Sequence, residues 1–401
     1  MKKHKGKILV LFLAVLLVSV MSCENPFLKK MLVEEEKGKT VPEKPHAPFV
    51  EGGASLILSP DKLDIKVKVT TADSTPVTVE GCTETELTSG TETVLQAKGR
   101  KVILKGNITG LYCGSNQLTA LNVQGLSALR WLDCDDNQLT TLNVQGLTAL
   151  KELICGNNQL TELNVQGLTA LQGLGCYNNQ LTALNVQGLT ALQGLSCGDN
   201  QLTALNVQGL TALKELWCVD NQLTELNVQG CTALYYLICH DNQLTTLDVQ
   251  GLTALRWLSC GGNQLTALNV QGLPALKELG CGGNQLTELN VQGLTALESL
   301  YCGYNQLTSI DVQGLTALRT LDCCNNQLNA DAFKKLFTDL PQITSSYGGF
   351  CVLYTERTDV TEGNHTDFTA PQDLKDAFDN AKIVKKWKMY KRDGSGSNVE
   401  I

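Results

Sequence analysis

The sequence predicts a repeat solenoid, that is, a stack of short chain coils, over the middle of this 401-residue chain. The motif in LRWLDCDDNQL, residues 129–139, recurs every 21 residues without insertion, so that eleven cysteines follow one another from Cys113 to Cys323. Within each unit, apolar residues recur at spacings that place them on one side of extended segments. A constant internal period of this length indicates an array in which each unit contacts only its neighbours.

Each unit, counted from Leu129, contains two extended limbs. Leu recurs at positions 1, 4, 11, 14 and usually 19, with Cys at 6, Asn at 9, Val at 16 and Gly at 18. The alternation of Leu132 and Cys134 predicts a short strand with both side chains inward, and that of Leu142 and Val144 predicts an extended return limb. A unit of this length has no room for a full helix, so we expect short strands or tight 3-10 turns on the outer side. A lone unit buries too little apolar surface to offset the entropy lost on ordering, so stacking must supply the stability.

The pattern LxxLxCxxNQL resembles the leucine-rich-repeat signature, with Cys where Leu is commoner, and the resemblance covers residues 108–328. It implies a right-handed, curved solenoid with one parallel strand per unit along the concave side. In form the chain resembles bacterial cell-surface leucine-rich-repeat lipoproteins, internalin-like adhesins among them. That resemblance implies attachment to host tissue, to a host extracellular protein or to other bacteria.

Two constant positions predict structural rows inside the stack. A thiol is a small hydrophobe that fits between crowded inward side chains, and an Asn side chain can satisfy backbone groups left unpaired where each strand ends. Soft-metal or redox chemistry is the alternative for the thiols, but leucine neighbours exclude solvent and raise thiol pKa values. The predicted rows are Cys113, Cys134, Cys155, Cys176, Cys197, Cys218, Cys239, Cys260, Cys281, Cys302 and Cys323, and Asn116, Asn137, Asn158, Asn179, Asn200, Asn221, Asn242, Asn263, Asn284, Asn305 and Asn326.

An array exposes apolar surface at both ends and needs caps. Residues 51–107 alternate apolar and polar residues between turn residues, which predicts a β-rich N-terminal cap. Residues 329–401 form the predicted C-terminal cap, with a helix over 329–341 and a second helix over about 370–388. The lysine-rich end of that second helix is expected to be a solvated charged face.

The first 22 residues combine a basic start, an apolar run of about fifteen residues, too short for a membrane-spanning helix, and a small residue before Cys23, which predicts an export signal. The stretch VMSC resembles the lipobox of bacterial lipoproteins, although Met21 stands where a small residue is usual. The resemblance implies that Cys23 is lipidated and anchors the chain at the bacterial cell surface or outer membrane. Plain secretion is the alternative. Residues 24–50 lack an apolar pattern, and we expect a flexible tether there.

The net charge of the whole chain is −8. Removal of the predicted signal leaves 28 basic against 40 acidic residues, a net charge of −12. Binding to nucleic acid needs clustered positive charge, so we do not expect a nucleic-acid partner. The sequence contains no phosphate-binding loop, HExxH or paired CxxC motif, and we expect no cofactor.

Differences between units concentrate at positions 2, 3, 5, 7 and 8, of which 3, 5 and 7 point out of the predicted sheet. Three of the four Trp and six of the nine Tyr lie at these positions, and no return limb carries an aromatic residue. Exposed aromatic rings on a rigid sheet are typical of binding surfaces. The alternative is that these rings arose by neutral sequence drift and stabilise the sheet by stacking between neighbouring strands. The predicted contact residues are Trp217, Val219, Tyr236, Ile238, His240, Trp257, Tyr235, Trp131, Tyr112, Tyr177, Tyr301 and Tyr304.

Units six to eight are expected to form the principal contact surface, because neighbouring rows are only about 4.8 Å apart. Rows almost free of side chains flank them. A bare floor beside aromatic anchors suits a partner segment that enters the curve. The bare positions are Gly173, Gly175, Gly194, Ser196 and Gly198 on one flank and Gly280 and Gly282 on the other.

The residues at position 8 suggest a metal site. Asp199, Asp220 and Asp241 follow one another there, and aligned carboxylates can bind Ca²⁺. The preferred alternative is that Asp and Asn shape the turn after each strand. His240, Ser259 and Asp220 or Asp241 suggest a catalytic trio, but an open sheet gives neither a water-excluding pocket nor an oxyanion site, so we expect no enzyme.

The predicted function is therefore that of a non-catalytic surface protein that binds a protein partner through its aromatic face. A carbohydrate binder, with Trp and Tyr stacked on sugar rings, is one alternative. A passive scaffold of the cell envelope is the other.

Overall fold

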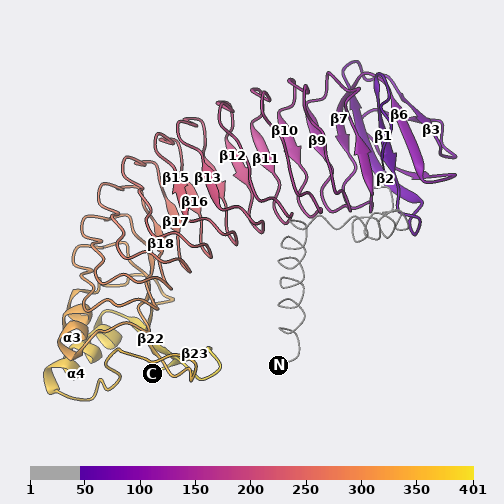
Figure 1. Ribbon diagram of the computed structural model, residues 1–401. Helices are drawn as coiled ribbons and strands as arrows, with labels where there is room; N and C mark the ends of the chain where they lie inside the picture. The colour runs from indigo at the N-terminus through magenta and orange to yellow at the C-terminus, as the bar shows by residue number, and fades with distance from the viewer. Residues whose placement is uncertain (1–45) are drawn as a thin grey trace, which may run out of the picture. The chain divides into compact units, whose positions relative to one another are not determined.

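The computed structural model describes residues 46–401, which form one compact unit. Within that unit the turns stack along an arc, with small sheets at the N-terminal end and helices at the C-terminal end (Figure 1). The predicted export signal, Cys23 and the tether as far as residue 45 lie outside the described residues. Over the part of the chain that the structure describes, no helix has both the length and the apolar character needed to span a membrane.

Eleven short strands, one from each unit, line one side of the stack. Each pairs in parallel with the strand of the next unit, and paired residues lie 21 positions apart, as Leu153 and Leu174 do. The predicted parallel sheet is confirmed. The strands are β7 (Ile108–Tyr112), β9 (Trp131–Asp133), β10 (Glu152–Ile154), β11 (Gly173–Gly175), β12 (Gly194–Ser196), β14 (Glu215–Trp217), β16 (Tyr236–Ile238), β17 (Trp257–Ser259), β18 (Glu278–Gly280), β19 (Ser299–Tyr301) and β20 (Thr320–Asp322).

The return limbs run on the opposite side of the stack and are mostly extended, as predicted. Tight turns complete each limb: Leu147 N donates to Val144 O at 3.3 Å, and Leu150 N donates to Leu147 O at 2.9 Å. Gly146, with a φ of +80°, makes this turn possible because it has no Cβ to clash. Three limbs contain a strand: β8 (Ala120–Asn122), β13 (Ala204–Asn206) and β15 (Glu225–Asn227).

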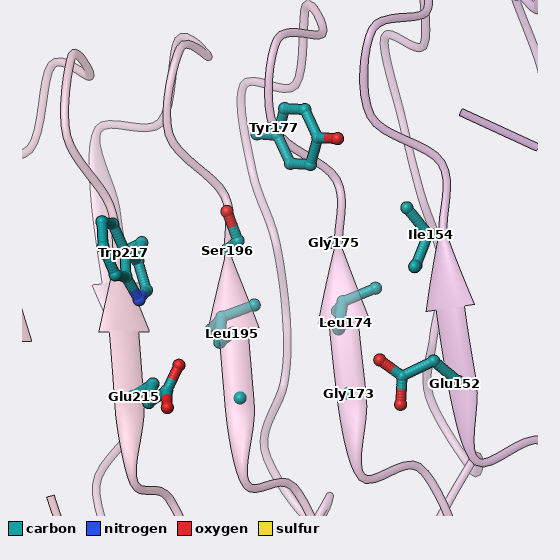
Figure 2. Close-up of a pocket in the computed structure, with 11 residues that line it drawn as sticks. Glu152, Ile154, Gly173, Leu174, Gly175, Tyr177, Leu195, Ser196, Glu215 and Trp217 are labelled. Carbon is teal, nitrogen blue, oxygen red and sulfur yellow. The ribbon is translucent and has the colours of Figure 1, made fainter. Parts of the chain in front are cut away.

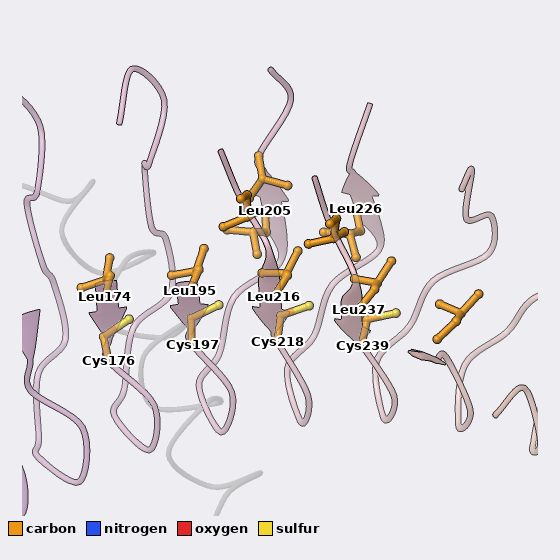
Figure 3. Packing of buried hydrophobic residues seen from close by; sticks show 14 of the residues in the cluster. Leu174, Cys176, Leu195, Cys197, Leu205, Leu216, Cys218, Leu226, Leu237 and Cys239 are labelled. Atoms are coloured by element: carbon orange, nitrogen blue, oxygen red, sulfur yellow. The ribbon is translucent and has the colours of Figure 1, made fainter. Parts of the chain in front are cut away.

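Leu, Val and Cys side chains from both limbs fill the space between them. Figure 3 shows Leu195 and Cys197 pointing inward from the sheet strand of their unit, with Leu205 of the following return limb above the same core. Every cysteine from Cys113 to Cys323 in the predicted row is fully buried. The core is therefore continuous from unit to unit, and each coil completes the burial of the one before it.

The N-terminal cap consists of antiparallel strands that continue both sides of the stack. On the return side, β4 (Glu86–Leu87), β3 (Val77–Glu80), β6 (Lys101–Lys105) and β1 (Gly53–Ile57) follow one another, and β1 pairs with β8. On the other side, β5 (Glu92–Gln96) pairs with β2 (Asp64–Thr71), which pairs with β7. The cap thus supplies a neighbour to both limbs of the first unit, and the predicted β-rich cap is confirmed.

Residues 46–50 differ from the predicted flexible tether. Ala47 is buried, and its carbonyl oxygen accepts a hydrogen bond from Asn122 Nδ2 at 3.1 Å. The backbone of Val50 lies so close to Gly125 that a Cβ at Gly125 would overlap with it. The tether prediction is therefore wrong for these residues, because the first return limb offers their backbone a hydrogen-bond partner that composition does not reveal.

The C-terminal end of the stack is covered by α3 (Ala330–Asp339), which lies within the predicted range of 329–341. Asn329 caps this helix: its Oδ1 accepts a hydrogen bond from Ala332 N at 2.9 Å. Phe333, Leu336 and Phe337 are buried, and the rings of Phe333 and Phe337 pack edge-on against that of Phe368. The helix thus replaces a twelfth unit as the neighbour that the apolar end requires.

The sheet itself continues beyond β20. The strand β21 (Gly349–Thr355) pairs in parallel with β20, β22 (Trp387–Arg392) with β21, and β23 (Asn398–Glu400) pairs antiparallel with β22. The predicted second helix over about 370–388 is consequently wrong at its end, since α4 (Gln372–Asp379) gives way to a π-helical turn, η1 (Asn380–Val384). Trp387 and Met389 alternate inward on β22, and the edge of β21 favours strand over helix there.

Candidate binding surface

The open side of the parallel sheet is built from positions 3, 5 and 7 of each unit, and we call it the sheet face. Leu at position 4 and Cys at position 6 point inward, whereas positions 3 and 5 of β9 to β19 are half-buried or exposed throughout. Trp131, Trp217 and Tyr301 are the most open aromatic residues there, with exposed fractions of 37%, 41% and 38%. The strand alternation therefore places variable side chains on one solvent-facing wall.

Three rings form a stacked run at the centre of the sheet face. Tyr236 and Trp257 are paired residues of β16 and β17, and their rings stack at 4.1 Å between centroids with planes only 11° apart. Trp217 stacks on the other side of Tyr236 at 6.2 Å, and Tyr235 meets Tyr236 edge-on at 5.0 Å. Cross-strand stacking, the predicted alternative, is thus real, and it holds the rings in fixed positions while one side stays open to solvent.

The other contact residues predicted for units six to eight border this run. Ile238 is the sheet partner of Trp217, and Val219 and His240 occupy the next outward positions of the same units. All three are half-buried. The structure therefore brings together Trp217, Val219, Tyr235, Tyr236, Ile238, His240 and Trp257, a group that we call the ring cluster.

The remaining predicted contact residues lie apart from the ring cluster. Tyr112 is next to the cap, where Lys68 Nζ lies 5.4 Å from its ring centroid. Tyr304 has a buried hydroxyl and is covered by Arg392, whose Cζ lies 5.7 Å from the ring centroid. Trp131 and Tyr301 stand at opposite ends of the array. The sheet face thus contains one aromatic cluster and isolated rings, not a continuous aromatic surface.

A shallow depression of about 340 Å³ adjoins the ring cluster, where the sequence has its glycine rows. Gly173, Gly175 and Ser196 of β11 and β12 form its floor (Figure 2), and Gly194 of β12 also lines it. Ile154 and Glu152 of β10 form one rim, Glu215 and Trp217 of β14 form the other, and Tyr177 stands above the floor. We call this depression the glycine groove.

Two carboxylates point into the glycine groove from opposite rims (Figure 2). The Glu152 carboxylate lies over Gly173, where an added Cβ would overlap with it, and burial raises the pKa of Glu152. Glu215 accepts a hydrogen bond from the Tyr235 hydroxyl, and this bond raises the pKa of Tyr235. Sequence reasoning missed both carboxylates, although position 3 of units three to six reads Glu, Gly, Gly, Glu and could have revealed them.

Tyr177 is held in place at the edge of the glycine groove. Its ring lies over Gly156, where a Cβ would overlap with it. Burial, followed by a hydrogen bond to Asp135, raises the pKa of Tyr177 to about 12. Tyr177 is therefore a fixed, neutral wall of the groove at physiological pH.

The aspartates at position 8 have a conformational reason to be there. Asp199, Asp220 and Asp241 have φ values of +53°, +49° and +55°, and position 8 is left-handed in all the units. Asn, Asp and Gly tolerate this conformation best, which favours the turn interpretation over the calcium hypothesis. Within residues 46–401, no group of three or more His, Cys, Asp or Glu side chains is placed to hold a metal ion.

The residues of the suggested catalytic trio, His240, Ser259 and Asp241, do not form a connected hydrogen-bonded chain among the residues that the structure describes. His240 Nδ1 lies 2.8 Å from Asp241 Oδ2, its neighbour in sequence. Ser259 is the sheet partner of Ile238, and its side chain forms no hydrogen bond with His240 in the described structure. The arrangement is a contact between a half-buried histidine and an exposed aspartate on an open surface.

The two constant rows support this face from behind. Asn200 Nδ2 donates to Cys176 O at 3.0 Å and to Cys197 O at 3.1 Å, and Leu181 N donates to Asn200 Oδ1 at 3.0 Å. Each Asn thus joins two successive coils where the strand ends. Burial raises the pKa of the row thiols, to about 12 for Cys176 and Cys260, so that they stay protonated and unreactive.

Comparisons with known proteins find similarity to leucine-rich repeats. A family model described as leucine rich repeats (2 copies) matches residues 295–336. Among solved structures, the chain is similar to the functional domain of InlJ from Listeria monocytogenes, which includes a cysteine ladder, at 25% identity over 65% of this chain and 76% of that one, with a TM-score of 0.35. It is similar to the internalin InlF of the same bacterium at 25% identity over 55% and 82%, with a TM-score of 0.39.

A leucine-rich-repeat protein of Leptospira interrogans is similar at 23% identity, over 69% of this chain and 82% of that one, with a TM-score of 0.42. Among curated proteins, no sequence matches this chain.

Proposed function

We propose that this leucine-rich-repeat protein binds a protein partner through its sheet face, with the ring cluster as the main anchor. The stacked run of Trp217, Tyr236 and Trp257 is the observation that carries the proposal. These rings are partly exposed, and the sheet holds them in place without burying them. Trp and Tyr held in this way lose little entropy on binding and are enriched among residues that dominate interface energies.

The partner proposal is tested by substitution within the ring cluster. We expect that Trp217→Ala combined with Trp257→Ala abolishes capture of the partner by the full-length protein, because the two outer rings of the stack are lost. The fold should persist, since the leucine and cysteine core is untouched, and circular dichroism with thermal melting checks this. Tyr347→Ala is the matched control, because Tyr347 is 85% exposed but lies in the C-terminal cap. Equal capture by both variants would rule the proposal out.

A carbohydrate ligand is the second candidate, because stacked rings also suit sugar faces. A glycan array and a protein pull-down, run on the same full-length protein, separate the two. Specific binding to a glycan that depends on Trp217 and Trp257 would favour the carbohydrate reading. An absence of any specific ligand in both assays would favour a passive envelope scaffold.

We further propose that this binding serves adhesion, which requires the sheet face to lie outside the cell. It rests on the sequence of the first 23 residues, which resembles an export signal that ends in a lipidated cysteine. We expect labelled palmitate to be incorporated into the wild-type chain in a bacterial host and not into Cys23→Ala. A wild-type chain that carries no label and leaves the cell freely would favour plain secretion.

A further inference from the structure

The glycine groove has open space that no residue of the described chain fills. A Cβ built on Gly194 would meet no atom within 4 Å, and the floor beside it is formed by Gly173 and Gly175. Three strand spacings separate β10 from β14, about 14 Å at roughly 4.8 Å each. A visiting peptide backbone can therefore lie against the floor over Gly194, between the Glu152 carboxylate above Gly173 and the rim formed by β14.

The charge of the groove is negative and is not neutralised from within. Within residues 46–401, neither Glu152 nor Glu215 forms an ion pair. The lysine beside Glu215 in sequence, Lys214, is directed elsewhere, since its Nζ donates to Gln193 Oε1 at 3.0 Å. Two carboxylates on facing rims attract a cation that enters between them.

The walls of the groove suit a flat cation in particular. Trp217 presents an exposed ring on one rim, and Tyr177 is fixed above the floor. Aromatic faces attract cations, and a planar guanidinium both stacks on a ring and donates to carboxylates in its plane. The Tyr235 hydroxyl holds the Glu215 carboxylate in place beside Trp217, so the acceptor is already oriented.

We propose that the glycine groove binds an arginine side chain presented by an extended segment of the partner, with Glu152 and Glu215 as acceptors and Trp217 as the stacking wall. This inference rests on the proposed function and adds the chemistry of the segment. The ring cluster then anchors the apolar part of the partner, and the adjacent groove selects for positive charge.

The test uses the full-length protein and short labelled peptides of glycine and serine with one central residue. We expect the arginine peptide to bind about tenfold more tightly than the peptide with citrulline, its neutral isostere, in fluorescence anisotropy. The double variant Glu152→Gln and Glu215→Gln should lose this preference. Glu278→Gln, an exposed glutamate at the same unit position on β18, should keep it.

Three results would overturn the inference. These are equal binding of the arginine and citrulline peptides, no binding of the arginine peptide up to its solubility limit, and a preference that survives in Glu152→Gln with Glu215→Gln. If the captured partner still depends on Trp217 and Trp257 in that case, the proposed function stands without the arginine site. If the variant with Trp217→Ala and Trp257→Ala captures the partner as well as the wild type does, the proposed function is wrong, whatever the result of the peptide test.

Discussion

At the scale of single residues, the Asn at position 9 holds successive coils together. The amide group of Asn200 has backbone partners in its own coil and in the coil before it, and it is almost fully buried. A buried backbone group that loses its partner costs about 1–3 kcal/mol. The row of Asn residues therefore stabilises every junction of the stack.

Asn200→Ala tests this role. It leaves the amide of Leu181 without its side-chain partner and removes one of the two asparagine donors from each carbonyl of Cys176 and Cys197, so we expect the free energy of unfolding to fall by about 1–3 kcal/mol. Urea denaturation measures the change. Gln201→Ala, at the exposed next position, should shift it by no more than about 0.5 kcal/mol. Similar losses in the two variants would contradict the role of the row.

The left-handed turn at position 8 makes a second prediction. Asp199 has a φ of +53°, which a β-branched residue adopts only with strain. We expect Asp199→Val to lower stability by about 1–3 kcal/mol and Asp199→Gly to leave it nearly unchanged. Thermal melting of both variants, with and without added calcium, is the measurement. A large loss in the glycine variant, restored by calcium, would instead revive the calcium hypothesis.

At the scale of elements, the sequence period predicted the strands well and the ends poorly. Eleven copies of one pattern determine which residues of a coil point inward, and the sheet register follows because every unit has the same length. The strand β22 and the packing of residues 46–50 depend on sheet edges and hydrogen-bond partners far away in sequence. Local patterns carry no information about such partners.

The candidate site also contains one part that the sequence predicted and one part that it did not. The ring cluster was predictable, since its rings occupy outward positions of adjacent units. Glu152 and Glu215 belong to the third and the sixth unit. Their carboxylates face a common groove only because the two units between them have glycine at the same position. Their directions, toward the groove and not away from it, follow from side-chain packing that the sequence pattern leaves open.

The C-terminal cap makes a prediction at this scale. Phe333 is fully buried in α3, where its ring centroid lies 5.6 Å from that of Phe337 and 5.1 Å from that of Phe368. We expect Phe333→Ala to destabilise the cap by about 3–5 kcal/mol, since a large cavity would remain. Hydrogen exchange should show faster opening of the last coils than of the first. Thr338→Ala, at an exposed position of the same helix, is the control. Uniform opening along the whole array would contradict the capping role.

At the scale of the whole molecule, the buried thiols link stability to pH. Burial raises the pKa of Cys176 and Cys260 to about 12, whereas a cysteine thiol in an unfolded chain has a pKa of about 8.5. The raised folded pKa means that the contribution of the row is complete below about pH 8.5 and is lost as the pH rises toward about 12, because only the unfolded state releases these protons.

We therefore expect the melting temperature to fall steeply above about pH 9, with each thiol contributing about 1.4 kcal/mol per pH unit. A variant with Cys176, Cys197 and Cys218 replaced by Ala should show a shallower fall, which separates the thiols from tyrosine ionisation. Calorimetry across this pH range is the measurement. Equal slopes for the variant and the wild type would contradict the linkage.

The sheet face as the binding surface is tested most directly by hydroxyl-radical footprinting of the full-length protein, free and bound to its captured partner. We expect the partner to protect Trp217, Tyr236 and Trp257, while Tyr347 in the C-terminal cap stays as reactive as in the free protein. Protection confined to the return limbs or the caps, with the three rings unchanged, would contradict the proposed surface.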